Sequence, residues 1–183
     1  PAATWRDFAD GRRCEKLLWN RLHHPGEVAA NPIMQFDQRA EILSLCRRLF
    51  PDGIQIPEGR EVADAATRAA HASGKTLYEP RLVEAGCEAS ASALVIQEGG
   101  PYDLVFATDA MNLRDAHLAE ATLAWRVFTG AGFSLRRARV LLLHRDYQSG
   151  VIVDPERLFR SQDVTSTVIA RQRVLVAAIA GAT

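Results

Sequence analysis

Residues 101–125, PYDLVFATDAMNLRDAHLAEATLAW, predict a strand that leads into a helix, and the expected fold depends on this unit. An apolar run ends in a polar turn, and the apolar residues that follow recur at helical spacing. The helix carries His117 and Glu120 near its beginning. A strand that runs into a polar helix start often positions a metal-dependent active site, but the strand interior, residues 104–108, reads LVFAT. The charge that such a site needs is therefore missing from the strand.

Before this unit, the sequence predicts helices and then the first strands of a sheet. Periodic apolar residues indicate two short helices within 4–24, further helices at 33–50 and 58–74, and a short strand at 54–57. Residues 76–100 are rich in strand-forming types. Turn signals at residues 84–86 and 98–101 join them to the strand of the central unit, so we expect an antiparallel meander of three strands.

After the central helix, expected at residues 113–129, the sequence returns to the sheet. Residues 138–147, ARVLLLHRDY, are almost continuously apolar at first, which predicts a strand buried on both faces in the sheet interior. An edge strand, a short helix and a final helix capped by Asp163 or Thr165 are expected at residues 151–153, 155–159 and 164–180. The final helix is apolar enough to dock on the domain or to form a homodimer face. Without repeats or a linker, residues 1–183 are expected to form one α/β domain.

Composition excludes several classes of protein. The 183 residues carry 22 basic and 22 acidic side chains, a balance that is unusual for a protein whose main task is to coat nucleic acid or an anionic membrane. No apolar segment is long enough for a membrane span, and the amino end does not resemble a signal peptide. The three cysteines, Cys14, Cys46 and Cys87, lack metal-binding or paired spacing and fit reduced thiols. We therefore expect a cytoplasmic protein without a membrane partner.

Six segments, in order and spacing, resemble a bacterial family of unknown function on the RecB-like branch of the PD-(D/E)XK nuclease superfamily. They are DFADGRRCEKLLWNRLHHP, RRLFPDGIQI, TLYEP, NLRDAHLAEA, GAGFSLRRARVLLLHRDY and LFRSQDVTS, and they cover residues 8–167. The resemblance implies a restriction-endonuclease-like fold, in which a mixed sheet with an αβββαβ core is flanked by helices. Extra helices would precede this core, and one would follow it.

In active members of this superfamily, carboxylates from an early helix and three strands hold Mg²⁺, and the last strand supplies a Glu-x-Lys triplet. Oxygen ligands suit this hard cation, which activates a water molecule, while the lysine offsets the developing charge. Carried over residue by residue, the resemblance assigns the helix acid to Glu41, the first-strand glutamate to Glu79 and the second-strand aspartate position to Ser92. The triplet falls on Phe106, Ala107 and Thr108.

The helix that follows the triplet retains part of the family pattern. His117 occupies the histidine position and Glu120 the acidic one, whereas the expected glutamine and tyrosine positions hold Ala124 and Phe128. The only lysines of the chain are Lys16 and Lys75, so no change of register restores the triplet. An arginine such as Arg114 is a poor substitute, because its guanidinium stays charged and prefers phosphate oxygens. These departures predict a degenerate active site without an intact catalytic residue.

Several residues allow more than one interpretation. Asp109 and Asp103 could have taken over a ligand role, but aspartate is also favoured at turns. Arg136, Arg137 and Arg139, like Arg114, could contact phosphates or pair with acids. His117 and Glu120 could form a functional pair or simply face solvent at the helix start.

Three functions therefore remain open. The preferred one is a pseudonuclease that binds nucleic acid or a protein partner and needs no cofactor. The second is an active Mg²⁺-dependent nuclease with a rearranged site that uses Glu41, Glu79, Asp109 and Glu120. The third is a structural or interaction protein without affinity for nucleic acid. A basic groove beside Glu79 would favour nucleic acid, and a neutral, filled cleft would favour the interaction module.

Overall fold

The computed structural model describes residues 36–147 and 153–172 of the chain. The two short helices expected within residues 4–24, most of the edge strand expected at 151–153 and the last part of the final helix lie outside these ranges. In chain order, the elements are α3 (Phe36–Leu49), β1 (Ile54–Gln55), α4 (Arg60–His71), β2 (Leu77–Tyr78), β3 (Arg81–Glu84), β4 (Cys87–Ser90), β5 (Ala93–Ile96), β6 (Tyr102–Ala107), α5 (Asp115–Gly130), β7 (Leu135–Leu143), α6 (Pro155–Leu158) and β8 (Phe159–Asp163). A fifth helix begins at Thr165 and is described as far as Gln172.

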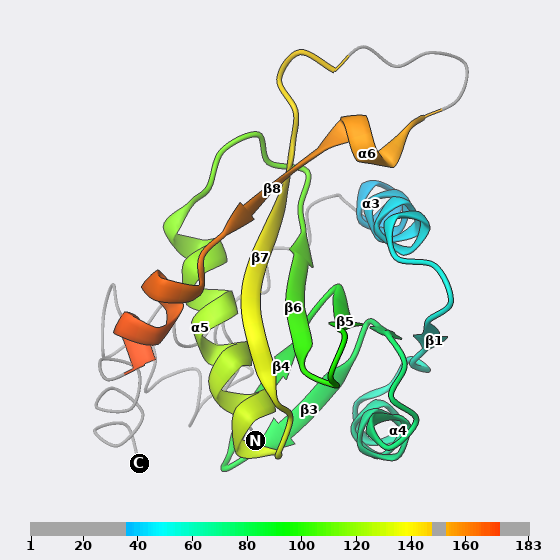
Figure 1. The fold of residues 1–183 in the computed structure, drawn as a ribbon, viewed down its shortest axis with the longest axis vertical. Helices are drawn as coiled ribbons and strands as arrows, with labels where there is room; N and C mark the ends of the chain where they lie inside the picture. The colour runs from blue at the N-terminus through cyan, green and yellow to red at the C-terminus, as the bar shows by residue number, and fades with distance from the viewer. Residues whose placement is uncertain (1–35, 148–152, 173–183) are drawn as a thin grey trace, which may run out of the picture.

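Six strands form one mixed sheet in the order β1-β2-β5-β6-β7-β8, and β3 and β4 form a separate two-stranded sheet (Figure 1). β5 is antiparallel to both β2 and β6, whereas β6 and β7 are parallel and are connected through α5. β6 and α5 are the strand and helix predicted from residues 101–125, and β7 is the strand predicted after them. The described part of the chain is therefore an α/β structure with a six-stranded mixed sheet and five helices.

The two faces of the large sheet pack against different helices (Figure 1). One face contributes Leu94, Leu104 and Val140 to a core that also contains residues of α4, α5 and the β3–β4 hairpin. The opposite face contributes residues such as Val105 and Leu141 to a second core around α3. The alternation of side chains along each strand thus supplies both cores from the same strands.

The meander expected from the sequence is present, but its first hairpin is divided between two sheets. Leu77 pairs with Leu94 in the large sheet and Arg81 pairs with Ser90 in the small one, so both pairings follow one continuous register. Backbone bonds from Glu79 N to Ser92 O (3.0 Å) and from Ala91 N to Pro80 O (3.1 Å) join the two parts. The antiparallel meander is therefore confirmed, and the structure adds that its first hairpin bends at Glu79, whose φ is 54°.

Helix α4 lies along the free edge of β3 in the small sheet. Asp64 Oδ1 accepts a hydrogen bond from Val83 N at 2.8 Å, and Arg68 Nη2 donates to Val83 O at 2.8 Å. Thr67 Oγ1 accepts from Arg81 N at 3.1 Å. These side chains satisfy strand-edge backbone groups that would otherwise need water or another strand.

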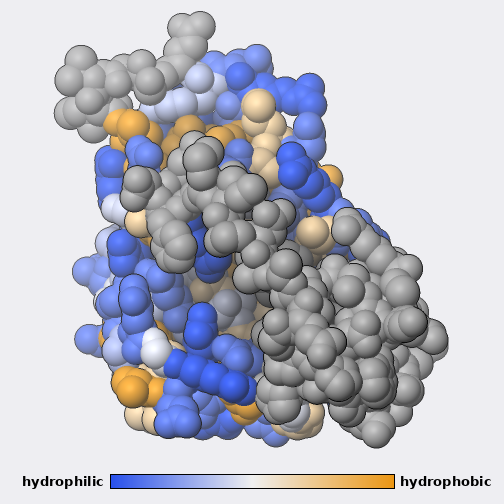
Figure 2. Space-filling view, turned by 180° about the vertical axis from the view of Figure 1, so that it is seen from behind, coloured by the Kyte–Doolittle hydropathy of each residue, from blue (hydrophilic) through white to orange (hydrophobic). Residues whose placement is uncertain are grey.

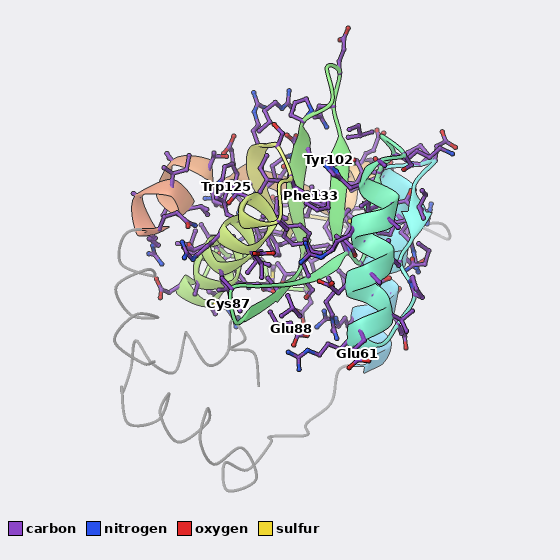
Figure 3. The ribbon with its side chains drawn as sticks, turned by 90° about the horizontal axis from the view of Figure 1, so that it is seen from below. Glu61, Cys87, Glu88, Tyr102, Trp125 and Phe133 are labelled. Atoms are coloured by element: carbon purple, nitrogen blue, oxygen red, sulfur yellow. The ribbon has the colours of Figure 1, made fainter. Side chains whose placement is uncertain are left out.

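At the beginning of β6 and β7, three aromatic side chains close the core on the α4 side. The Tyr102 and Phe133 rings lie 5.9 Å apart between centroids, and the His71 ring lies 4.1 Å from Phe133 (Figure 3). Tyr102 and Phe133 are both buried. This cluster fixes the start of both parallel strands relative to α4.

The carboxyl-terminal elements confirm some predictions and correct one. β7 lies between β6 and β8, as its apolar sequence predicted, and α6 matches the expected short helix. The edge of the sheet is β8, which the sequence analysis did not predict as a strand because FRSQD is polar. Asp163 accepts hydrogen bonds from the Thr165 N–H (2.9 Å) and hydroxyl (2.6 Å), which starts the final helix as expected.

The final helix docks on the rest of the molecule over its described turns. Val168 is fully buried in the core shared with α5, and Gln172 Nε2 donates to Thr122 O of α5 at 2.7 Å. Ile169 is exposed. The homodimer face proposed for this helix stays a prediction. None of the helices in the described ranges has the length and apolar character that a membrane span requires.

Candidate functional site

The positions that correspond to the nuclease motif lie on three adjacent strands, where the long hairpin bends. Glu79 follows β2, Ser92 precedes β5, and Phe106 and Ala107 end β6, with Thr108 just beyond it. Ser92 connects its neighbours on both sides, because its carbonyl accepts from Glu79 N and its amide donates to Val105 O at 2.9 Å. The fold therefore brings Glu79, Ser92 and the end of β6 together through backbone hydrogen bonds.

The Glu79 carboxylate is neutralised by protein groups. Its Oε1 atom lies 3.3 Å from Arg47 Nη1 and accepts a hydrogen bond from Gln55 Nε2 at 3.2 Å. Arg47 Nη1 also donates to Gln55 Oε1 at 2.6 Å, so the three side chains form a closed set. The Glu79 side chain is 32 % exposed. Arg47 therefore places a positive charge beside Oε1 of this carboxylate.

The Ser92 hydroxyl is hydrogen-bonded to the backbone. Its hydroxyl accepts a hydrogen bond from Ala107 N at 2.8 Å and so replaces a regular ladder bond between β5 and β6. An aspartate at this position in active nucleases would offer two charged oxygens, whereas this single hydroxyl is engaged in holding the sheet together.

The triplet positions offer no oxygen to a metal ion from the strand interior. Phe106 is buried in the core on the α5 side, whereas Glu79 reaches Arg47 of α3. If the triplet is shifted by one residue, its first and third positions fall on Val105 and Ala107, on the α3 side. Neither side chain has an oxygen that could bind a metal ion. Thr108 lies beyond the strand, and its hydroxyl accepts from Ala110 N at 3.2 Å within the turn.

The carboxylate of β6 lies at the other end of the strand. Asp103 is fully buried, and Arg136 contacts both of its oxygens, with Nε–Oδ1 and Nη2–Oδ2 distances of 2.9 Å. Arg139 Nη1 is 3.6 Å from Oδ2, and Gln97 accepts from Arg136 Nη2 at 2.9 Å. Asp103 is thus a structural ion-pair partner and not an accessible ligand.

The four arginines considered for phosphate contacts differ in how they are held. Arg136 and Arg139 contact Asp103, and Arg137 lies 3.8 Å from Asp163. Arg139 also donates to Ser161 Oγ at 3.0 Å, and its guanidinium lies 6.0 Å from the centroid of the Phe50 ring.

Arg114, the fourth of these arginines, is exposed at the start of α5. Its backbone N–H donates to His117 Nδ1 at 3.1 Å. The three arginines of β7 (Arg136, Arg137 and Arg139) are each paired with a carboxylate.

The remaining candidate acids do not join Glu79 in a metal site. Glu41 is exposed on α3, and it is Arg47, later on the same helix, that reaches Glu79. Asp109 is exposed in the turn after β6, and Glu120 is partly buried on α5. Within residues 36–147 and 153–172, no three His, Cys, Asp or Glu side chains form a group that could hold a metal ion.

Sequence reasoning missed Arg47 and Gln55, whereas it named the neighbouring thiol, Cys46, as reduced. Cys46 is buried beside this set; burial raises the pKa of its thiol to about 12, with the Arg47 charge lowering it and the Glu79 charge raising it. Such a thiol stays protonated and unreactive at neutral pH. Arg47 and Gln55 lie on different elements from Glu79, and no local spacing in the sequence predicts that they meet.

Hollows and apolar patches on the described surface are modest. A hollow of about 450 Å³ is lined by His144, Asp146, Tyr147, Glu156, Arg157 and Phe159, and lies near α6. The exposed large apolar side chains, Val62, Met111 and Ile169, belong to different parts of the chain. Figure 2 accordingly shows a largely polar face with apolar residues in small separate groups.

Comparison of the chain with protein-family models, with curated proteins and with solved structures gives no match.

Proposed function

We propose that the chain is a catalytically degenerate PD-(D/E)XK nuclease-like protein that acts as a binding module. The observation that carries this proposal is the Arg47–Gln55–Glu79 set, in which an arginine neutralises the carboxylate that a catalytic metal would need. Ser92 and Phe106, at the other two motif positions, are engaged in a backbone bond and in the core.

The order of elements supports the nuclease-like part of this proposal. A helix, three strands joined as an antiparallel meander, a helix and a fourth strand parallel to the third follow one another as α4, β2–β5–β6, α5 and β7. This is the αβββαβ order that the sequence resemblance implies for a restriction-endonuclease-like core.

Of the two partner classes, a protein partner is better supported than nucleic acid. Phosphate binding requires cationic side chains that are available to exchange counterions for phosphates. Arg136, Arg137 and Arg139 are instead held on carboxylates, and Arg47 is held on Glu79. The arginine beside Glu79 is thus engaged with that carboxylate, and the three arginines of β7 are engaged with Asp103 and Asp163.

The catalytic part of the proposal is tested by incubating the purified full chain with single- and double-stranded DNA and RNA in Mg²⁺ or Mn²⁺. We expect no cleavage above the background of a matched preparation of Glu79→Ala. Cleavage by the wild-type chain that Glu79→Ala abolishes would contradict the proposal and would favour the rearranged nuclease.

The choice of partner is tested by fluorescence anisotropy with labelled oligonucleotides at increasing salt. A phosphate-binding protein loses affinity steeply as salt rises, so we expect no salt-dependent binding at physiological ionic strength. Specific binding that weakens in Arg136→Gln or Arg137→Gln but not in Arg68→Gln, a control on α4, would instead establish nucleic acid as the partner.

A further inference from the structure

The first turn of α5 uses an imidazole ring where most helix starts use an oxygen. Arg114, the residue before the helix, donates its backbone N–H to the ring Nδ1 of His117 at 3.1 Å. In return, the backbone N–H of His117 donates to the carbonyl oxygen of Arg114 at 3.1 Å. In the usual reciprocal cap, a Glu or Gln three residues into the helix accepts this bond. A ring nitrogen that accepts a hydrogen bond carries no proton, so this cap requires neutral His117 with its proton on Nε2.

The charges around His117 act against its protonation. Arg114 and the positive end of the α5 dipole disfavour a second positive charge, whereas Asp109 in the preceding turn favours it. Asp115 is paired with Arg171 at 2.7 Å, and Glu120, one turn along α5, also has an interaction of its own. Burial and the Arg114 charge together hold the pKa of His117 below its ordinary value of 6.5, and Asp109 only partly offsets them.

The turn that this cap completes is also held by Ala110 and Leu113, which pack in the core, and by a few polar bonds. Residues 108–114 connect β6 to α5 beside the end of β7. Leu143 N donates to Ala110 O at 2.9 Å, and Arg145 Nη2 donates to Asn112 Oδ1 at 2.8 Å. Arg160 Nη2 lies 3.4 Å from Met111 O. The bonds to Arg145 and Arg160 are exposed, so the Arg114–His117 cap is one of the contacts that tie this turn to the helix, beside the bond from Leu118 N to Arg114 O.

We propose that His117 is a proton sensor, and that its protonation releases the 112–114 segment and the first turn of α5. A proton on Nδ1 would place two donors against each other, and the Arg114 N–H would lose its acceptor. The segment adjoins the end of β6, so its release would open the molecule beside the candidate site. This inference rests on the cap geometry and holds whether or not the chain is a nuclease-like binding module.

The direction of the pH effect follows from the lowered pKa. The folded form binds the proton more weakly than the unfolded chain, so the cap stabilises the fold fully above the ordinary value of 6.5. This contribution falls as the pH drops from that value towards the lower pKa of the folded form. Acidification thus loosens the turn, whereas alkaline conditions leave it closed.

The experiment is amide hydrogen exchange at Arg114 and His117, followed by NMR on the full chain and corrected for the intrinsic pH dependence of exchange. Between about pH 7.5 and about pH 5.5, we expect protection to fall roughly fivefold, the factor that corresponds to loss of one helix cap. His117→Gln keeps an acceptor that does not titrate, so its protection should stay constant. His117→Ala should show the low protection at both pH values.

His144→Gln is the matched control, because His144 is exposed beyond β7 and its ring Nδ1 accepts from a nearby turn amide, Asp146 N. This variant should keep the wild-type pH dependence. The proposal is overturned if His117→Gln retains that dependence, or if the His117 ring titrates at or above 6.5 in an NMR titration of the folded chain.

Discussion

At the beginning of β6, the Asp103 carboxylate is fully buried beneath two arginines, whereas at the end of β2 the Glu79 carboxylate is partly exposed beside one. Both are neutralised by guanidinium groups, but their contacts differ in strength. Arg136 contacts both oxygens of Asp103 at 2.9 Å, and Arg47 contacts one oxygen of Glu79 at 3.3 Å. The buried Asp103 carboxylate is thus part of the structural framework, whereas the Glu79 carboxylate remains accessible to solvent.

The acidic side chain that residues 104–108 lack is found elsewhere on the same strand. The strand does carry an acid, but the acid lies at the end of β6 away from Thr108, and its pairing removes it from chemistry. Glu79 lies at the end where the sequence resemblance would place a metal ion, and Arg47 supplies a positive charge there. Both carboxylates are therefore paired with arginines of the chain itself.

The largest effect is expected for Asp103→Asn. An amide cannot accept both guanidinium bonds and places a buried N–H₂ group against donors, so we expect a loss of about 3 kcal/mol in the free energy of unfolding. This is the low end for breaking a buried ion pair, because the arginines retain access to water. Urea denaturation measures the loss, and Arg136→Gln should destabilise the fold in the same direction. A loss below that of Glu79→Gln would remove the contrast between the two carboxylates.

The packing around β2 is tested by Gly53→Ala. A Cβ atom on Gly53 would lie 2.4 Å from Cζ of Tyr78, whose hydroxyl also accepts a hydrogen bond from Gly53 N at 2.9 Å. We expect a loss of about 2 kcal/mol, typical of overpacking in an ordered region. Tyr78→Leu removes the ring, and in that background the additional cost of Gly53→Ala should disappear. Equal costs in both backgrounds would show that the clash is relieved by movement of the backbone.

A smaller effect is expected for Ser92→Ala, which removes the acceptor of the Ala107 N–H. We expect a loss of about 1 kcal/mol, the net value of one such hydrogen bond. Thermal unfolding measures it, with Ser90→Ala on β4 as the matched control. If both variants behave alike, the Ser92 hydroxyl does not hold β6 as described.

The smallest effect is expected for Glu79→Gln. A partly exposed ion pair contributes little, so the loss should be about 0.5 kcal/mol and should shrink at high salt. Denaturation at low and high ionic strength measures this change. A loss comparable to that of Asp103→Asn would mean that Glu79 belongs to the structural framework as firmly as the buried acid does.

Much of the framework was predictable because it follows from local patterns. Apolar spacing located α3, α4 and α5, and the continuous apolar run in β7 indicated its central position. β8 escaped prediction because its sequence is polar and its strand conformation depends on pairing with β7.

The candidate site was predictable only in part. The resemblance alone grouped Glu79, Ser92 and Phe106 in one site, and no local pattern in the sequence did so. It did not indicate that Arg47 and Gln55 would meet Glu79, since these contacts join α3, β1 and β2 in space. The bend at Glu79 was also hidden, because glutamate has no strong preference for a positive φ.

The bent hairpin has a consequence for which length changes the chain can tolerate. Because one register runs through both sheets, the two-residue turn at Ala85 and Gly86, both with positive φ, sets the pairing of β2 with β5 as well as that of β3 with β4. Inserting or deleting one residue there would turn alternate side chains outward in two cores at once. This turn should therefore keep its length in natural variants, whereas the Gly99–Gly100 turn between β5 and β6 constrains the large sheet alone.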